Sequence, residues 1–170
     1  MTPFLPLAGR RVLSLAQQLP GPYCGLLLAE LGADVILVEQ IPGGDPARMF
    51  GSLFATANRG KRSVALDLKN PAGLAAFDRL VATADVVLEG FRPGVARRLG
   101  IDHDRLVGIR PGLVSCSISG YGQDGPAALL PGHDISYQAR AGAVVDAAGR
   151  VGGNSLPVAE IGRASCRERV

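Results

Sequence analysis

The segment 131–137 contains a side chain that could move a proton. His133 follows a glycine and leads into an apolar run with the pattern of a helix. Imidazole titrates near neutral pH, so a histidine can take a proton from carbon or return one to it. A lone histidine near a helix start is more often structural. The segments upstream therefore decide between these two interpretations.

Those upstream segments have the residue types of an anion-binding site. Their basic residues are Arg59, Lys61, Arg62, Arg92 and Arg98. Guanidinium groups bind phosphates through paired hydrogen bonds. A further segment, 119–126, contains three glycines, and backbone N–H groups in such a loop can face an anion or a carbonyl oxygen. Taken singly, each segment is as typical of an ordinary solvated surface.

Alternating apolar runs predict the elements that would position these residues. Strands are expected over 11–15, 35–38, 63–68, 85–89 and 113–118, and helices over 23–31, 71–82, 95–99 and 133–145. Asn70 followed by proline predicts an N-cap for the second of these helices. Strands and helices that alternate with short connections predict an α/β fold, with a doubly wound, mostly parallel, Rossmann-like sheet.

In such a sheet, ligands bind beyond the carboxyl ends of the strands. The loops expected at those ends are 18–22, 40–62, 90–94 and 120–131, and most of the segments named above lie in them. The first part of 40–62, residues 40–58, is a long loop in which a helical turn is expected around 46–50, and loops of this length usually serve function. The first loop lacks the G-x-G-x-x-G pattern, which argues against NAD or FAD bound in the usual Rossmann manner.

The composition argues against several classes of protein. The chain has 170 residues, enough for one domain with a sizeable core, and a formal charge of +3. Without the last ten residues, 15 basic side chains face 14 acidic ones, so no nucleic-acid partner is expected. No signal peptide or membrane-spanning run is evident, which predicts a cytoplasmic protein without a membrane partner. The cysteines have no metal-ligand spacing, and no metal site is expected.

Residues 161–170 differ from the rest of the chain. They contain three arginines within seven positions and show no helical or strand period. One reverse translation of them, ATCGGAAGAGCGTCGTGTAGGGAAAGAGTG, matches sequencing-adapter DNA. We interpret 161–170 as a non-native tail and 1–160 as the native part. Codon 160 is then a hybrid, in which only the first base is native.

Taken together and in this order, the motifs resemble the family III CoA-transferases of the CaiB/BaiF type, which include the α-methylacyl-CoA racemases. The resemblance covers about residues 8–160 and rests on 21–24, 28–35, 59–69, 89–94, 119–122 and 132–137. It implies that 1–160 are the N-terminal part of a large CoA-binding domain. The substrate is then an acyl-CoA thioester, and no cofactor is bound permanently. Family members are longer chains that form interlocked homodimers, so we expect an inactive fragment of such an enzyme.

The racemase branch implies a role for each matching residue. His133 matches a histidine that faces an aspartate across the α-carbon of the acyl-CoA; one removes the α-proton and the other returns a proton. That aspartate follows an apolar pair matching 158–159, so Glu160 is expected to be an aspartate in the native gene. The implied CoA contacts are Arg92 and Arg98 at the phosphates, Ala65, Leu66, Asp67 and Leu68 near the adenosine, and Pro131, Gly132, Asp134, Ile135 and Ser136 around the thioester. Gln40 stands where many relatives carry Arg or Lys, which puts one phosphate contact in doubt.

Two other functions stay open. The transferase branch uses the later aspartate as a nucleophile, which forms an acyl anhydride and then a thioester with CoA. Those enzymes often have a glutamine where this chain has Leu19, and they often lack the histidine at the position of His133. The resemblance therefore favours racemisation or epimerisation of a 2-methylacyl-CoA. The alternatives are a CoA-transferase that moves CoA between carboxylic acids and a non-catalytic nucleotide-binding fragment.

Overall fold

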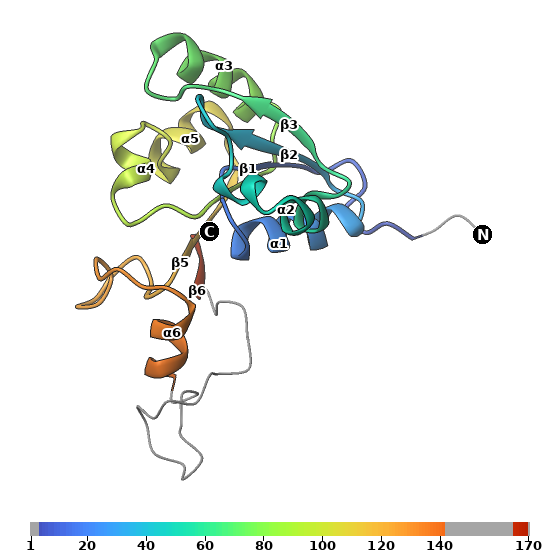
Figure 1. Cartoon of the computed structure of the whole chain (residues 1–170). Helices are drawn as coiled ribbons and strands as arrows, with labels where there is room; N and C mark the ends of the chain where they lie inside the picture. Colours follow the sequence, from blue (N-terminus) through green and yellow to red (C-terminus); the bar gives the residue numbers. More distant parts are fainter. Residues whose placement is uncertain (1–3, 142–164, 170) are drawn as a thin grey trace.

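The computed structural model describes residues 4–141 and 165–169 (Figure 1). The strands are β1 (Arg11–Ser14), β2 (Asp34–Glu39), β3 (Arg62–Ala65), β4 (Val86–Glu89), β5 (Val114–Ser119) and β6 (Ser165–Arg169). The helices are α1 (Pro20–Glu30), the short 3₁₀ helix η1 (Pro46–Met49), α2 (Gly51–Asn58), α3 (Pro71–Val81), α4 (Val95–Arg98), α5 (His103–Ile109) and α6 (Asp134–Arg140).

One sheet joins all six strands in the order β3-β2-β1-β4-β5-β6. Strands β1 to β5 are parallel, and β6 is antiparallel to β5. From β1 the chain first winds outward through β2 and β3, and then crosses to β4 on the other side of β1. The prediction of a doubly wound, mostly parallel α/β sheet is therefore confirmed. In such a sheet the carboxyl ends of β1 and β4 form the switch point where ligands bind.

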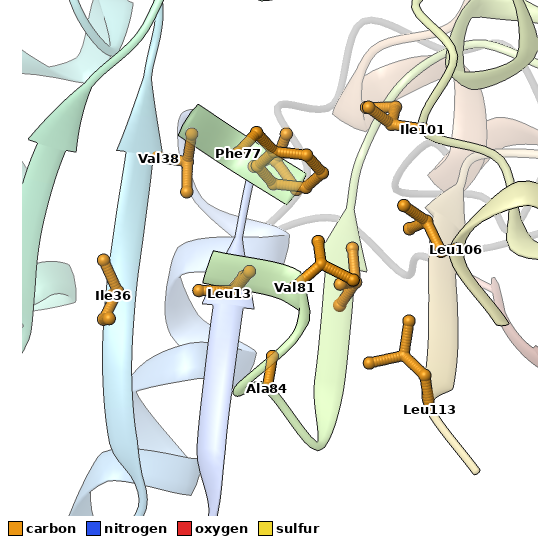
Figure 2. Close-up of a cluster of buried hydrophobic side chains, with 11 residues drawn as sticks. Leu13, Ile36, Val38, Phe77, Val81, Ala84, Ile101, Leu106 and Leu113 are labelled. Carbon is orange, nitrogen blue, oxygen red and sulfur yellow. The ribbon is translucent and has the colours of Figure 1, made fainter. Parts of the chain in front are cut away.

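Successive residues of the central strands point into two different apolar layers. Leu13 and Ile36 lie beneath Phe77 and Val81 of α3, as Figure 2 shows. Val12, the residue before Leu13, belongs to the second layer with residues of α1. Because both faces are covered, the strands read as continuous apolar runs rather than alternating ones. The sheet is thus held rigidly behind the loops at its carboxyl edge.

The ends of several elements differ from the sequence expectation. Helix α1 begins at Pro20, three residues early, because proline is well suited to the first turn of a helix. Strand β3 ends at Ala65, so the expected strand residues 66–68 are instead a loop. The expected cap of α3 is confirmed: the Asn70 side chain accepts a hydrogen bond of 2.9 Å from the N–H of Ala72.

The helical turn expected around 46–50 is present as η1, and residues 51–58 form the additional helix α2, where only a loop was expected. The segment has weak amphipathic character, and its helical form rests on tertiary burial, as at Ala57, which is 2% exposed. Helix α6 begins one residue after His133 and ends at Arg140. The remainder of the helix expected to reach 145 lies outside the described residues.

Residues 165–169 pair with β5 as the strand β6, although their sequence has no strand pattern. An edge strand presents unpaired N–H and C=O groups, and these accept an extended segment largely irrespective of its sequence. The pairing therefore reflects the open edge of β5. The assignment of 161–170 as a non-native tail stays a prediction.

Candidate active site

A cavity of about 570 Å³, called here the larger cavity, lies at the switch point, beyond the carboxyl ends of β1, β4 and β5. Three of the four loops predicted to converge there contribute to its wall. Its lining comprises Leu15, Gln17, Gln18, Leu19 and Pro20 after β1, Gly90, Phe91, Arg92 and Pro93 after β4, and Ile118, Ser119, Gly120, Tyr121, Ala128, Leu130, Gly132, His133 and Tyr137 from β5 onward. A cavity of this size and mixed character is typical of a small-molecule site.

Close approach of backbone fixes the first loop. A Cβ on Gly21 would lie 2.0 Å from the Cβ of Ala16, so only glycine lets the start of α1 meet the end of β1. The second loop is held by Glu89, whose carboxylate accepts a hydrogen bond of 2.6 Å from the N–H of Phe91 and another from the Ser117 hydroxyl. Burial raises the pKa of Glu89 above its ordinary value.

His133 stands at the rim of the larger cavity, at the N-cap of α6. Its backbone N–H lies 3.5 Å from the Oγ of Ser136, within the first turn of the helix. The hydroxyl of Tyr137 donates a hydrogen bond of 2.8 Å to the carbonyl of Gly132, the residue before His133. Tyr137 therefore ties down the peptide that carries the histidine into the cavity.

The Tyr137 ring requires glycine on either side of it. A Cβ on Gly120 would lie 2.2 Å from the ring, and one on Gly132 would lie 2.5 Å from it. The ring also packs edge-on against Tyr121, with 5.0 Å between the ring centroids. Burial raises the pKa of Tyr137, although nearby Arg92 opposes the shift. The glycines of this loop thus make room for a tyrosine that shapes the cavity.

A smaller cavity of about 280 Å³ lies beyond the ends of β2 and β3. Leu66, Asp67, Leu68 and Lys69 supply one wall. The loop is pressed against α3, because a Cβ on Gly73 would lie 2.0 Å from the carbonyl oxygen of Asp67. Early termination of β3 is what leaves these residues free to line the cavity.

The two cavities share part of their walls. Leu15, Gln17 and Phe91 line both of them. An elongated ligand could therefore extend from His133, past the ends of β4 and β1, to the loop that follows β3. This path is the main geometric feature of the site.

The buried carboxylate of Glu39 lies at the β2 end of this path, at the centre of a network of hydrogen bonds. Glu39 is 5% exposed, and Arg48 binds both of its carboxylate oxygens at 2.6 Å. The Ser63 hydroxyl and the Asp45 N–H donate two further hydrogen bonds to the same carboxylate, of 2.5 and 3.0 Å. These donors, Arg48 foremost, lower the pKa of Glu39 to about 2.

The structure brings some of the predicted site residues together and leaves others apart. Arg92, Gly132 and His133 line the larger cavity, and Leu66, Asp67 and Leu68 line the smaller one. Arg98 at the end of α4, Ala65 at the end of β3, Pro131 and Ser136 line neither cavity. Asp134 and Ile135 form the first turn of α6, and Glu160 lies outside the described residues.

The basic cluster at 59–62 lines neither cavity. Strand β3 begins at Arg62, so the cluster stands at the amino end of a strand, away from both cavities. Arg59 pairs with Glu30, and Arg62 binds Asp34. Lys61 donates hydrogen bonds of 2.6 and 2.8 Å to the Pro22 carbonyl and to Asn58, and burial lowers its pKa to about 8. The charges of this turn are used in local ion pairs and hydrogen bonds, which differs from both a phosphate site and a solvated turn.

Sequence reasoning missed several residues of the site. Tyr137 was not predicted to have a role, although Gly120 and Gly132 were a signal that a large side chain nearby needs space. Gln17 and Gln18 line the larger cavity, and no pattern marked them. Asp45 lies in a long loop and was not predicted as a site residue, because its burial depends on contacts that local sequence does not encode.

Two searches of residues 4–141 and 165–169 gave negative results. No helix there is both long enough and apolar enough to cross a bilayer. No three His, Cys, Asp or Glu side chains in the same part of the chain gather where they could hold a metal ion.

Comparison with known proteins identifies the family. The family model described as CoA-transferase family III matches residues 7–159. The chain is 44% identical over 151 residues to a succinate–glutarate CoA-transferase of Agrobacterium fabrum, which covers 81% of this chain and 38% of that protein. It is 42% identical over 151 residues to an alpha-methylacyl-CoA racemase of Mus musculus, with 89% and 37% covered.

Solved structures agree with this result. The crystal structure of a CAIB/BAIF family protein from Brucella suis superposes with a TM-score of 0.78 at 41% identity, over 82% of this chain and 40% of that one. The chain thus spans about two-fifths of the length of these relatives. On this evidence it is a member of CoA-transferase family III.

Proposed function

We propose that the chain supplies the acyl-CoA-binding part of an enzyme that racemises or epimerises 2-methylacyl-CoA thioesters. The observation that carries the proposal is the position of His133 on the larger cavity, which joins the smaller cavity through a shared wall. CoA is a long ligand with a reactive thioester at one end and an adenosine at the other. A path of two connected cavities suits that shape.

In the proposed reaction His133 takes the α-proton of the bound thioester, and the electron pair of the C–H bond becomes an enolate. The acid at position 160 then donates a proton to the opposite face of the same carbon, which inverts its configuration. Donors at the cavity wall would have to stabilise the enolate oxygen. For the next turnover in the same direction, the proton moves back through solvent.

For the CoA moiety we propose the placement that the cavities favour. The adenosine end lies against Leu66, Asp67 and Leu68 in the smaller cavity, and Gly132 and His133 face the thioester in the larger one. Arg92 stands on the wall of the larger cavity, where it can meet a phosphate. We also propose supporting contacts from Ala65, Arg98, Pro131, Asp134, Ile135 and Ser136, which are close in sequence to residues that line the cavities.

CoA transfer between carboxylic acids is the second candidate. The observation in its favour is the 44% identity to a named succinate–glutarate CoA-transferase. In this reaction the carboxylate at position 160 attacks the thioester, releases the CoA thiolate and forms an anhydride. His133 would then have no proton to move at carbon, which is the difference that an experiment can use.

Deuterium exchange separates the two reactions. The longer parent enzyme, incubated with 2-methylacyl-CoA in D₂O and no acceptor acid, should incorporate one deuterium at the α-carbon, as measured by mass spectrometry. A His133→Ala variant should lose this exchange while still binding CoA. CoA exchange that requires an acceptor acid, without α-deuteration, would establish the transferase instead. CoA binding with neither activity would leave a binding module.

We further propose that position 160 is an aspartate in the native gene and that 161–170 are foreign to it. The match to the family model ends at residue 159, which supports this boundary. Resequencing the source DNA through codon 160 tests both statements. An aspartate codon followed by a continued reading frame is the expected result, and a native Ala, Val or Gly codon would contradict it.

The parent enzyme is proposed to be a cytoplasmic homodimer. Tyr23 and Leu27 of α1 and its C-cap residue Leu31 follow one another at intervals of four, and each is 44–54% exposed. An exposed apolar stripe of this kind suits a protein interface. Light scattering of the parent enzyme should give twice the mass of one chain.

A further inference from the structure

Gln18, in the loop between β1 and α1, has an uncommon backbone conformation. Its φ is +65°, and among residues 4–141 and 165–169 it is the one non-glycine residue with positive φ. The left-handed region is unfavourable for a residue with a Cβ unless its surroundings enforce it. Gln18 and its neighbours Gln17 and Leu19 all line the larger cavity, so the strained backbone forms part of the site.

The surroundings that enforce it centre on Asp45. Both carboxylate oxygens of Asp45 accept the N–H of Gln18, at 3.0 and 3.1 Å. Asp45 belongs to a loop 27 positions further along the chain, so local sequence does not dictate this contact. Its side chain is 1% exposed, and water therefore offers the Gln18 N–H little competition.

Asp45 is itself held from two sides. The Ala47 N–H donates a hydrogen bond of 2.8 Å to its carboxylate, and its own N–H donates to Glu39 at 3.0 Å. Glu39 is in turn bound by Arg48 through two hydrogen bonds of 2.6 Å. Gly44 must be glycine at this point, because its φ is +68° and a Cβ there would lie 2.7 Å from a Glu39 oxygen.

From this geometry we infer that Asp45 is a positioning residue, which holds Gln18 in the left-handed conformation and so places Gln17 on the wall common to both cavities and Gln18 and Leu19 on the wall of the larger one. Asp45 lines neither cavity, so it acts on a ligand only through Gln18. The expected effect on CoA rests on the proposed function. The effect on the loop does not.

The test uses four forms of the 170-residue chain: the unchanged chain, Asp45→Asn, Gln18→Gly, and the double variant. Hydrogen exchange at the Gln18 amide reports directly on the hydrogen bond to Asp45. It should be slow in the unchanged chain and accelerate at least about tenfold in Asp45→Asn, because a carboxylate acceptor is replaced by a weaker neutral one. Urea unfolding of each form separates this local effect from a global loss of stability.

CoA affinity, measured by titration calorimetry, provides the second readout. Asp45→Asn should weaken CoA binding by roughly tenfold in the presence of Gln18. In the Gln18→Gly background the same substitution should cost less than about threefold, because glycine adopts positive φ without help. A purely structural role for Asp45 predicts an equal loss in both backgrounds, and that result would overturn the inference.

The remaining outcomes are also decisive. Exchange at Gln18 that is unchanged in Asp45→Asn would overturn the inference whatever CoA does. Absence of CoA binding by the unchanged chain would count against the proposed function in this chain, while the exchange measurement still decides the role of Asp45. If Asp45→Asn does not fold, Gln18→Val and Gln18→Asn replace it. Asn tolerates the left-handed region and Val does not, so only Val should expose the loop amides to rapid exchange.

Discussion

The two cavities are walled by different means. At the smaller one, the buried Glu39 and Asp45 and the half-exposed Arg48 form a network in which charged groups hold two loops together. Around the larger one, on the side that follows β5, glycines at 120 and 132 admit the ring of Tyr137, and the polar tie there is its hydroxyl on a backbone carbonyl. The first wall is built from long-range electrostatics, and the second from steric fit. The stability of the first wall should therefore depend on pH and on charge-changing substitutions, and that of the second on substitutions that change side-chain volume.

Removal of the charge on Glu39 should have the largest effect. Glu39→Gln leaves Arg48, Ser63 and the Asp45 N–H without a carboxylate, and should lower the free energy of unfolding by about 3 kcal/mol. Urea unfolding at pH 7 measures this. Glu30→Gln is the matched control, since the Glu30–Arg59 pair has side chains 46% and 57% exposed and should contribute less than about 0.5 kcal/mol. An equal loss of unfolding free energy in the two variants would contradict a special role for the Glu39 network at the smaller cavity.

The same carboxylate sets an acid limit. The pKa of Glu39 falls from an ordinary 4.5 to about 2 on folding, so its contribution is complete above pH 4.5 and is lost as the pH falls toward 2. Allowing for the half-exposed Arg48, the loss should be roughly 2 kcal/mol. Glu39→Gln should lack this part of the pH dependence, and a variant whose acid profile matches that of the unchanged chain would contradict the assignment.

A single methyl group should disturb the larger cavity next most strongly. Gly120→Ala places a Cβ 2.2 Å from the Tyr137 ring and should cost about 2 kcal/mol, with faster hydrogen exchange over 119–137. Gly108→Ala in α5 is the control, because a Cβ there meets nothing within 4 Å and should be neutral or stabilising by up to about 1 kcal/mol. If Gly120→Ala behaved like this control, the fit around Tyr137 would not be tight.

Loss of the Tyr137 hydroxyl should have the smallest effect. Tyr137→Phe keeps the ring between its glycines but removes the hydrogen bond to Gly132, at a cost of about 1 kcal/mol. The imidazole resonances of His133 in NMR spectra should broaden or move, because the preceding peptide is no longer fixed. Tyr23→Phe, at a tyrosine 54% exposed on α1, should leave both stability and those resonances unchanged.

The contrast between the cavities also explains what the sequence could reveal. The apolar runs predicted the doubly wound sheet, since covering both faces of a parallel sheet demands them. The same apolar runs mark where β4 and β5 end, so the loops that follow these strands were predicted correctly. The basic cluster at 59–62 was harder to interpret, because charge alone does not tell at which end of a strand it will stand. The role of Asp45 could not be predicted from the sequence, because its burial depends on a partner 27 positions away.

The shared wall has a consequence for how such an enzyme can diversify. Leu15 and Phe91 border both cavities, so a substitution at either would alter the binding of both ends of one ligand. The rim formed by Ala128 and Leu130 borders only the larger cavity and could change without that penalty. New acyl preferences should therefore be easiest to select in libraries randomised on this rim, with the partition between the cavities left untouched.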